Sequence, residues 1–404
     1  TRLHQVHIEM GGRMVPFGGW DMPVWYSSVS EEHAAVRQQA GLFDVSHMGV
    51  LEASGPNAES FLNLVTTNDV TTLQVGQSHY TYLLYPDGSV VDDLLIYRRG
   101  PEKFMLVVNA SNNDKDWAWL NAVNDGRVQI DSRRPSARIQ HPAVLRDLRD
   151  PANGDDCLVD IALQGPASKA ILLEMCGDAA LATRIEGLGW AELTEGVLGT
   201  YPIVISRTGY TGERVAYELF VHPDSSPDFW RDLMQAGQKH GLKPCGLAAR
   251  DSTRTEAGLP LYGHELAGPL ALSPAEAGFG SYVKFWKPFF IGREASIGKW
   301  EDLNRHVVRF RFDDKGVRRA ELGDPILDKR GKVVGIVTSC AIDSEGFLLG
   351  QAAVQESVAT PGSSVAIYQL GGGQRALKAP KEIAVGARMP LADRATVLSR
   401  FPKR

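Results

Sequence analysis

The sequence has few cysteines and none of the spacings that bind metal ions or crosslink small secreted domains. Only four cysteines occur in 404 residues, and no two of them form a Cys-X-X-Cys pair. The ten histidines include no His-Glu-X-X-His arrangement. We therefore expect reduced thiols in a cytoplasmic protein, and we predict no metal site.

Long apolar runs and strong charge are also missing. No uncharged stretch reaches the ~18 apolar residues of a membrane span, and the opening residues, TRLHQVHIEMGG, contain no apolar signal-peptide core. The net charge is -5 and there is no basic tract, so the chain lacks the electrostatic footprint of a nucleic-acid-binding protein. We expect neither a membrane nor a nucleic acid as partner. The phosphate-binding motifs GxxxxGK[ST] and GxGxxG and the hydrolase motif GxSxG are absent as well.

What is present is typical of a globular chain with more than one domain. Hydrophobic residues make up 43% and charged residues 23%, and 404 residues are too many for one ordinary core. Helix and strand patterns mix up to about residue 300, and short alternating strands between Gly and Asp turns follow from His306. We predict an α+β body over residues 1–300, with a surface insertion at 132–156, and an all-β barrel domain over residues 306–404.

The most informative stretch is a predicted β-hairpin with two adjacent acids in its second strand. Residues 77–97 read QSHYTYLLYPDGSVVDDLLIY, with the turn signal Pro86-Asp87-Gly88 between two β-rich runs. Side chains alternate between the faces of a strand, so Asp92 and Asp93 point to opposite sides. A buried carboxylate must be paired, hydrogen-bonded or protonated, and in a pocket it can recognise or deprotonate a nitrogen-rich ligand. The alternative is a barrel-rim strand whose acids meet water or cap a neighbour.

Three further segments bear on this region. A helix is predicted over Ser30–Gln39, with Ser30 as its N-cap and Gly41 as its end. Residues Leu42–Leu51 alternate like a strand, and Phe104–Asn109 is typical of a buried strand.

A series of fragments in the first 300 residues resembles one known family in content and order. They are GGRMVPFGGWDMPVWY from Gly11, GLFDVSHMG from Gly41, VVDDLLIY from Val90, VVNASNNDKDW from Val107, ALQGP from Ala162, SRTGYTGE from Ser206, GLAARDSTRTEAGLPLYG from Gly246 and FIGREA from Phe290. Together they resemble the folate-binding aminomethyltransferases, the family of the T-proteins of the glycine cleavage system. The resemblance implies that family's multidomain α+β fold, with antiparallel sheets, flanking helices and a C-terminal β-barrel module.

The resemblance also implies a tetrahydrofolate site with Asp93 as its catalytic carboxylate. The positions that match the family's folate pocket are Met48, Tyr80, Asp93, Tyr97, Val107, Asn109, Tyr210, Glu218 and Arg250. A carboxylate such as Glu218 can accept two N–H bonds from a pterin, and aromatic rings can line its flat faces. Arg250 can pair with the glutamate tail or with a local acid. By residue type alone, the same positions are equally typical of core packing, helix capping and structural ion pairs.

The activity that the resemblance implies is aminomethyl transfer in the glycine cleavage system. Ammonia leaves the aminomethyl group on the dihydrolipoyl arm of the H-protein, and the methylene passes to tetrahydrofolate to give 5,10-methylenetetrahydrofolate. Lipoylated H-protein would then be a transient partner. Two alternatives stay open: a tetrahydrofolate-dependent demethylase or methyltransferase for a small S-, N- or O-methylated donor, and a folate-binding assembly protein without catalysis. The absence of a KGCYxGQE-type cysteine motif disfavours the assembly protein.

One loop departs from the family pattern. From Gly209 the chain reads GYTGERVAYE, one residue longer than usual and without the Asp-Gly that normally follows. Tyr217 and Glu218 still supply the aromatic residue and the acid, so we expect the loop before them to bulge.

Overall fold

The structure, a computed structural model, describes residues 1–369, 383–390 and 392–402. It combines antiparallel sheets, flanking helices and a closed six-stranded barrel, which confirms the predicted α+β class with a C-terminal β-barrel. Within the described residues, no helix is long and apolar enough to cross a membrane.

The chain forms two compact units. Unit 1 comprises residues 1–250 and 281–297, and unit 2 comprises residues 251–280 and 298–404. The domain limits inferred from the sequence stay a prediction.

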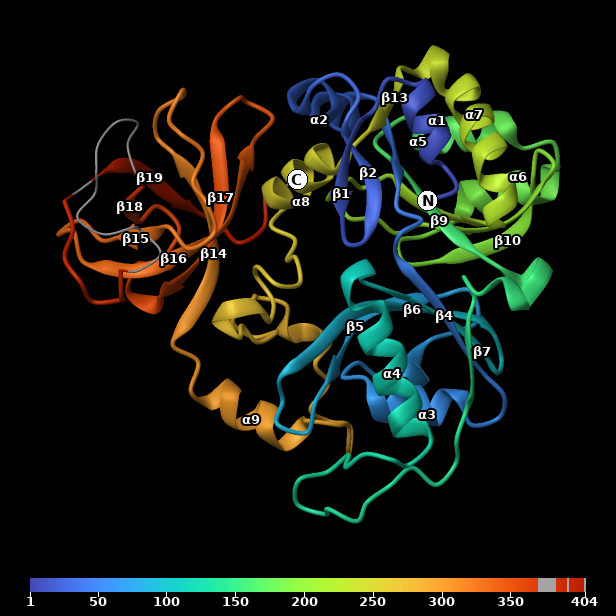
Figure 1. Ribbon diagram of the computed structural model, residues 1–404, viewed down its shortest axis with the longest axis horizontal. Helices are drawn as coiled ribbons and strands as arrows, with labels where there is room; N and C mark the ends of the chain where they lie inside the picture. The colour runs from blue at the N-terminus through green and yellow to red at the C-terminus, as the bar shows by residue number, and fades with distance from the viewer. Residues whose placement is uncertain (370–382, 391, 403–404) are drawn as a thin grey trace. The chain divides into compact units, whose positions relative to one another are not determined.

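The predicted hairpin lies in a five-stranded sheet of unit 1, with strand order β5-β6-β7-β4-β8 (Figure 1). Its strands are β4 Gly49–Ser54, β5 Ser78–Leu84, β6 Val90–Gly100, β7 Lys103–Val108 and β8 Val144–Asp147. The turn between β5 and β6 needs Gly88, whose φ is +72° and where a Cβ would lie 3.1 Å from atoms of Ala295 and Ser296. Strand β8 comes from the segment 132–156, and it pairs with β4 at the edge of the sheet.

A six-stranded sheet of unit 1 has the order β10-β11-β12-β9-β3-β13. Its strands are β3 Ala40–Asp44, β9 Val159–Gln164, β10 Leu193–Leu198, β11 Tyr201–Ser206, β12 Ala216–Val221 and β13 Leu242–Cys245. Strands β3 and β13 pair in parallel, and the other four pairings of this sheet are antiparallel.

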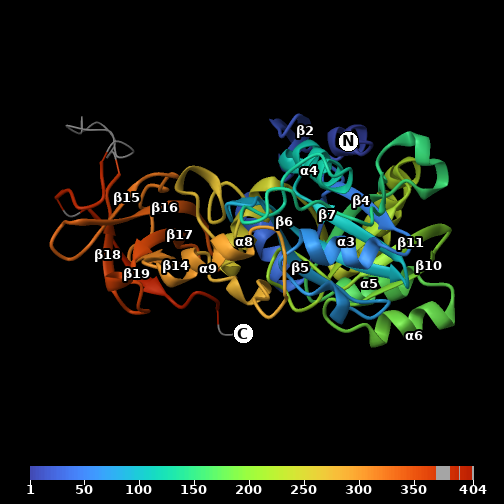
Figure 2. The same ribbon diagram turned by 90° about the horizontal axis from the view of Figure 1, so that it is seen from below.

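Helices pack against both sheets (Figures 1 and 2). The first sheet carries α3 Ala58–Val65 and α4 Asn113–Asn124, and the second carries α5 Ser168–Met175, α6 Ala179–Gly187 and α7 Ser226–Gly237. Before them come α1 His4–Glu9, the hairpin of β1 Arg13–Phe17 and β2 Trp20–Trp25, and α2 Val29–Gln38. Helix α2 packs against the opposite face of the second sheet, in a cluster with Val36, Phe43 and Ala162. On that face the two sheets also meet in a shared apolar cluster. It includes Val50, Met105 and Val107 from the first sheet, and Val204 and Phe220 from the second.

Three local predictions are wrong. Helix α2 begins one residue early because Ser28, in extended backbone, accepts the Glu31 N–H and acts as the N-cap in place of Ser30. Gly41 does not end this helix but lies within β3, where a Cβ would clash with Val36 and Cys245. The strand expected over Leu42–Leu51 is interrupted by a turn at residues 45–48, which separates β3 from β4.

Unit 2 contains the closed barrel, in the order β14-β17-β16-β15-β18-β19. Its strands are β14 Arg305–Phe312, β15 Pro325–Leu327, β16 Val333–Ile342, β17 Leu348–Gln355, β18 Ser364–Ile367 and β19 Asp393–Leu398. Apolar side chains such as Phe310, Val337 and Val397 form its core, as the alternating pattern predicts. Helices α8 Leu247–Ala257 and α9 Arg293–Glu301 each contain a boundary between the units.

In unit 1, Lys287 fastens the segment 281–297 to the loop before β5. The side chain is 2% exposed, and its Nζ donates to the carbonyl oxygens of Thr66 at 2.7 Å and Asn68 at 2.8 Å. Burial lowers the pKa of Lys287 to about 7. The same segment carries Tyr282, whose ring lies 5.0 Å from that of Tyr80.

We predict that Lys287→Met destabilises the protein by about 1–3 kcal/mol, because two buried carbonyls lose this donor. Urea unfolding of the full chain measures the effect. Lys284→Met is the matched control: its Nζ donates to the Ser281 carbonyl at an exposed position, so the change should stay within about 0.5 kcal/mol. Equal losses in both variants would contradict the role given to Lys287.

Candidate functional site

The site is built where the inner faces of the two sheets of unit 1 meet. Asp93 and Tyr97 share a face of β6 because they are four residues apart on a strand. On the second sheet, Glu218 and Phe220 share the facing side of β12. The Tyr97 and Phe220 rings lie 5.6 Å apart, and the Tyr97 hydroxyl donates to Glu218 Oε2 at 2.8 Å. The central strands of both sheets therefore supply side chains to one place.

Both oxygens of the half-buried Asp93 carboxylate accept a hydrogen bond. The Tyr80 hydroxyl donates to Oδ2 at 2.7 Å, and Asn109 Nδ2 donates to Oδ1 at 3.0 Å. Burial, and after it the charge of Asp92, raise the pKa of Asp93 to about 7. A carboxyl group with this pKa can gain or lose a proton at neutral pH.

Asp92 points to the opposite side of β6, as the sequence predicts, because Asp92 and Asp93 pair with successive residues of β5. Its side chain is fully buried. Asn109 N at 3.0 Å, Asn109 Nδ2 at 2.9 Å and Asn112 Nδ2 at 2.5 Å all donate to its carboxylate. The alternative of a rim strand with solvated acids is therefore wrong for Asp92, which meets the hydrogen-bonding requirement of a buried carboxylate.

A second carboxylate, Glu218, is 7% exposed and is held by hydroxyl groups. Tyr97 and Thr208 both donate to its Oε2, and the Thr208 hydroxyl oxygen lies 3.0 Å from Ser206 Oγ. Glu218 sits in regular register, opposite Ser206 on β11 and Ala162 on β9. The extra residue of the loop is thus accommodated at 207–215 and leaves the strand that carries Glu218 regular.

Tyr210 and Arg250 form the third group. The guanidinium carbon of Arg250 lies 4.8 Å from the centroid of the Tyr210 ring, which is a cation–π contact. Burial raises the pKa of Tyr80 well above its usual value, and Asp93 and the nearby Tyr210 add to the shift. Tyr210 therefore acts electrostatically on the Tyr80 phenol.

The structure thus gathers the nine predicted residues into contact groups in unit 1. Tyr80 and Asn109 meet Asp93, Tyr97 meets Glu218, and Tyr210 meets Arg250, while the remaining two, Met48 and Val107, belong to the apolar cluster between the sheets. No local sequence pattern pointed to Thr208, Asn112 or Tyr282. Thr208 and Asn112 do lie inside the fragments SRTGYTGE and VVNASNNDKDW, whereas Tyr282 follows no pattern and reaches Tyr80 from a distant segment.

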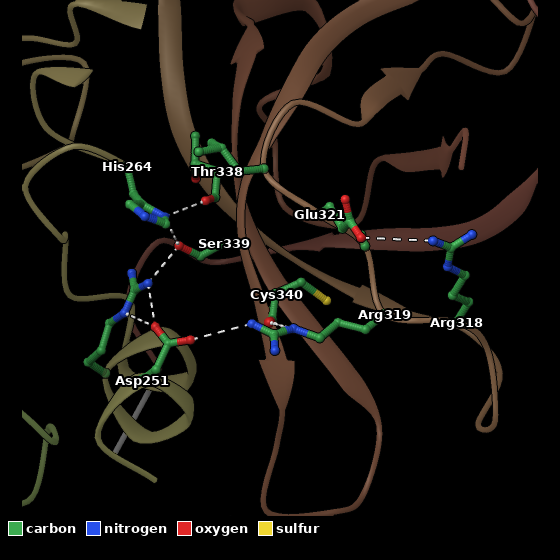
Figure 3. Close-up of a pocket in the computed structure, with 11 residues that line it drawn as sticks. Asp251, His264, Arg318, Arg319, Glu321, Thr338, Ser339 and Cys340 are labelled. Atoms are coloured by element: carbon green, nitrogen blue, oxygen red, sulfur yellow. Dashed lines mark hydrogen bonds and ion pairs between the residues drawn. The ribbon is translucent and has the colours of Figure 1, made fainter. Parts of the chain in front are cut away.

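A separate pocket of about 460 Å³ lies in unit 2 (Figure 3). It is lined by Asp251, Arg254, His264, Arg318, Arg319, Ala320, Glu321, Leu322, Thr338, Ser339 and Cys340. Its charged groups pair with one another: Asp251 contacts Arg254 at 2.6 Å and Arg319 at 3.6 Å, and Arg318 contacts Glu321 at 3.8 Å. None of the predicted site residues lines this pocket.

Comparison with known proteins gives consistent matches. The family model of the GCVT N-terminal domain matches residues 3–287. An aminomethyltransferase from Halothermothrix orenii is 40% identical over 371 residues, which cover 91% of this chain and 94% of that protein. One from Bacillus subtilis is 41% identical over 341 residues, which cover 84% and 86%. The crystal structure of glycine cleavage system aminomethyltransferase T from Bartonella henselae superposes with a TM-score of 0.76 and 27% identity, over 99% of this chain and 96% of that one.

The fold and the matches define a transferase enzyme with an α+β body and a β-barrel module. The chain belongs to the aminomethyltransferase family that carries the GCVT domain. The resemblance seen in the sequence is confirmed, and the roles of the individual site residues stay predictions.

We predict that Tyr97→Phe lowers the free energy of unfolding by about 1.5–3 kcal/mol, the usual value of a hydrogen bond to a charged group. Denaturant unfolding measures the loss of the bond to Glu218. Tyr217→Phe is a matched control, since Tyr217 is also fully buried and its hydroxyl has no hydrogen-bond partner within the described ranges. We expect the control to be neutral or stabilising, and a similar loss in both variants would contradict the strength assigned to the Tyr97–Glu218 bond.

Proposed function

We propose that the chain is the aminomethyltransferase of a glycine cleavage system. It takes the aminomethyl group carried on the dihydrolipoyl arm of the H-protein, releases ammonia, and transfers the methylene to tetrahydrofolate. The products are ammonia, 5,10-methylenetetrahydrofolate and the H-protein with its dihydrolipoyl arm free as a dithiol. Relatives with this activity in their names match most of the chain. The observation that carries the proposal is the half-buried Asp93, held at both oxygens by Tyr80 and Asn109.

The site fits a folate in the chemistry of its residues. A pterin presents N–H donors on a flat ring, and the site offers two carboxylates whose partners here are neutral hydroxyl and amide groups. The residues that would hold the ligand are Met48, Tyr80, Asp93, Tyr97, Val107, Asn109, Tyr210, Glu218 and Arg250. When bound, tetrahydrofolate supplies the ring nitrogens that capture the one-carbon unit.

Asp93 then has three tasks. It orients the folate, stabilises the positive charge that develops as ammonia leaves, and accepts or returns a proton. The hydrogen bonds from Tyr80 and Asn109 fix the direction of its carboxylate before the substrates bind, so little reorganisation is needed during the reaction. Glu218, fixed by Tyr97, accepts N–H groups of the ring.

The proposed activity also implies a protein partner and a cellular compartment. Lipoylated H-protein binds transiently and delivers the aminomethyl group, and the reaction takes place in the cytoplasm. Four free cysteines fit a reducing compartment.

The proposal is tested by mixing the protein with tetrahydrofolate and aminomethyl-loaded H-protein, and by following ammonia and 5,10-methylenetetrahydrofolate together. Stoichiometric appearance of both products is expected. Turnover of free methylated compounds without H-protein would contradict the proposed donor and favour a folate-dependent demethylase.

We predict that Asp93→Asn lowers kcat by about 10²–10⁴-fold, the range of a lost general acid or base, while the fold persists. The control is Asp114→Asn, an exposed acid on the first turn of α4, which should keep its turnover. Near-normal turnover of a folded Asp93→Asn enzyme would remove Asp93 from the mechanism.

We also predict that kcat/KM falls as the pH drops through about 7. The pKa of Asp93 is raised to about 7, so below this pH the carboxyl is protonated and cannot stabilise positive charge. Above it the carboxylate is ionised, and the rate should reach a plateau. A profile that stays flat from about pH 5.5 to about pH 9 would show that Asp93 does not titrate as the structure implies.

A further inference from the structure

The amide of Asn109 lies between the two adjacent acids of β6. Its Nδ2 is 2.9 Å from Asp92 Oδ1, 3.0 Å from Asp93 Oδ1 and 3.2 Å from the Asp93 carbonyl oxygen. Its backbone N also donates to Asp92 Oδ2, at 3.0 Å. Asp92 therefore holds Asn109 through both nitrogens, and an amide with only two N–H hydrogens must share them between the two carboxyl groups.

Asp92 is a costly residue at its position. On its side of β6 the neighbouring Leu94 is buried in an apolar cluster, and another apolar side chain in place of Asp92 would satisfy the packing. Burying a carboxylate is unfavourable before its hydrogen bonds are counted. The fold nevertheless supplies Asn109 and Asn112 as donors to it.

We propose that Asp92 is a positioning residue for Asp93: it fixes Asn109 so that the amide meets the Asp93 carboxylate, and it places a buried negative charge beside that carboxylate. The inference rests on the proposed function, in which Asp93 is the catalytic group. Asp92 itself touches no substrate, because it faces the helix-covered side of the sheet.

The charged groups on the surrounding elements support this assignment. After burial, the charge of Asp92 contributes most to the raised pKa of Asp93, whereas the hydrogen bonds from Tyr80 on β5 and from Asn109 lower that pKa. On α4, burial and the charge of Asp92 raise the pKa of Asp116 to about 10. Asp116 is therefore neutral at neutral pH and adds no charge.

The other ionisable side chains near the pair have smaller roles. Lys115 on α4 donates to Asn112 Oδ1 at 3.1 Å, and its charge acts on Asp116. The raised pKa of Tyr80 keeps its phenol neutral.

Asp92→Asn and Asp116→Asn form a matched pair of isosteric changes at fully buried acids. Only the first removes a charge at neutral pH. We expect Asp92→Asn to move both the acidic limb of kcat/KM and the titration of the Asp93 carboxyl from about pH 7 to about pH 6 or below, and Asp116→Asn to leave both in place. The Asp93 carboxyl is followed by ¹³C NMR of aspartate-labelled protein, assigned by the signal lost in Asp93→Asn.

A second variant, Asn109→Ser, is expected to shift the Asp93 titration in the opposite direction. It keeps the buried charge but removes the amide, whose hydrogen bond lowers the pKa of Asp93, so the Asp93 titration should move above about pH 7. This result tests the hydrogen bond from Asn109 to Asp93 even if Asp92→Asn does not fold.

The NMR titration separates this inference from the proposed function. An enzyme inactive towards H-protein but with the expected shifts would overturn the proposed donor and leave the positioning role standing. A wild-type Asp93 that titrates near its usual value, or one whose titration is the same in all folded variants, would overturn the role of Asp92.

Discussion

One amide that bridges two adjacent carboxyl groups is the interaction on which the site depends. Neighbouring residues of a strand must point to opposite faces, so Asp92 enters the helix-covered side of the sheet while Asp93 enters the space between the sheets. Asn109 can reach both because it directly follows Val108, which pairs with Leu94 in the neighbouring strand. The register of β6 and β7 therefore decides whether Asp93 is held, and burial together with the charge of Asp92 raises the pKa of Asp93.

The two carboxylates of the site contrast with the charged groups of the unit 2 pocket. Asp93 and Glu218 are held by phenol, hydroxyl and amide donors, which leave the charge of a carboxylate uncancelled. In the pocket of unit 2, Asp251 instead pairs with Arg254, so its charge is already compensated. A ligand rich in N–H donors gains more from the first arrangement, because hydrogen bonds to an uncompensated carboxylate are stronger than those between neutral groups.

Much of this region could be predicted from the sequence. The turn residues and the alternation of the hairpin predicted its two strands, and the separation of Asp92 from Asp93 follows from the geometry of any strand. The choice of Glu218, Tyr210 and Arg250 came from the family resemblance, since their contacts join segments far apart in the chain. Local pattern could not reveal the break at residues 45–48 or the approach of Tyr282 to Tyr80, because both depend on tertiary packing.

A crystal structure of the full chain with bound tetrahydrofolate tests the central claim most directly. The account predicts the pterin ring between the two sheets of unit 1, with its nitrogens within hydrogen-bond distance of the Asp93 and Glu218 carboxylates. It also predicts that Asn109 keeps its bonds to both acids of β6. A folate seated in the unit 2 pocket beside Arg254, with Asp93 free of ligand contact, would contradict it.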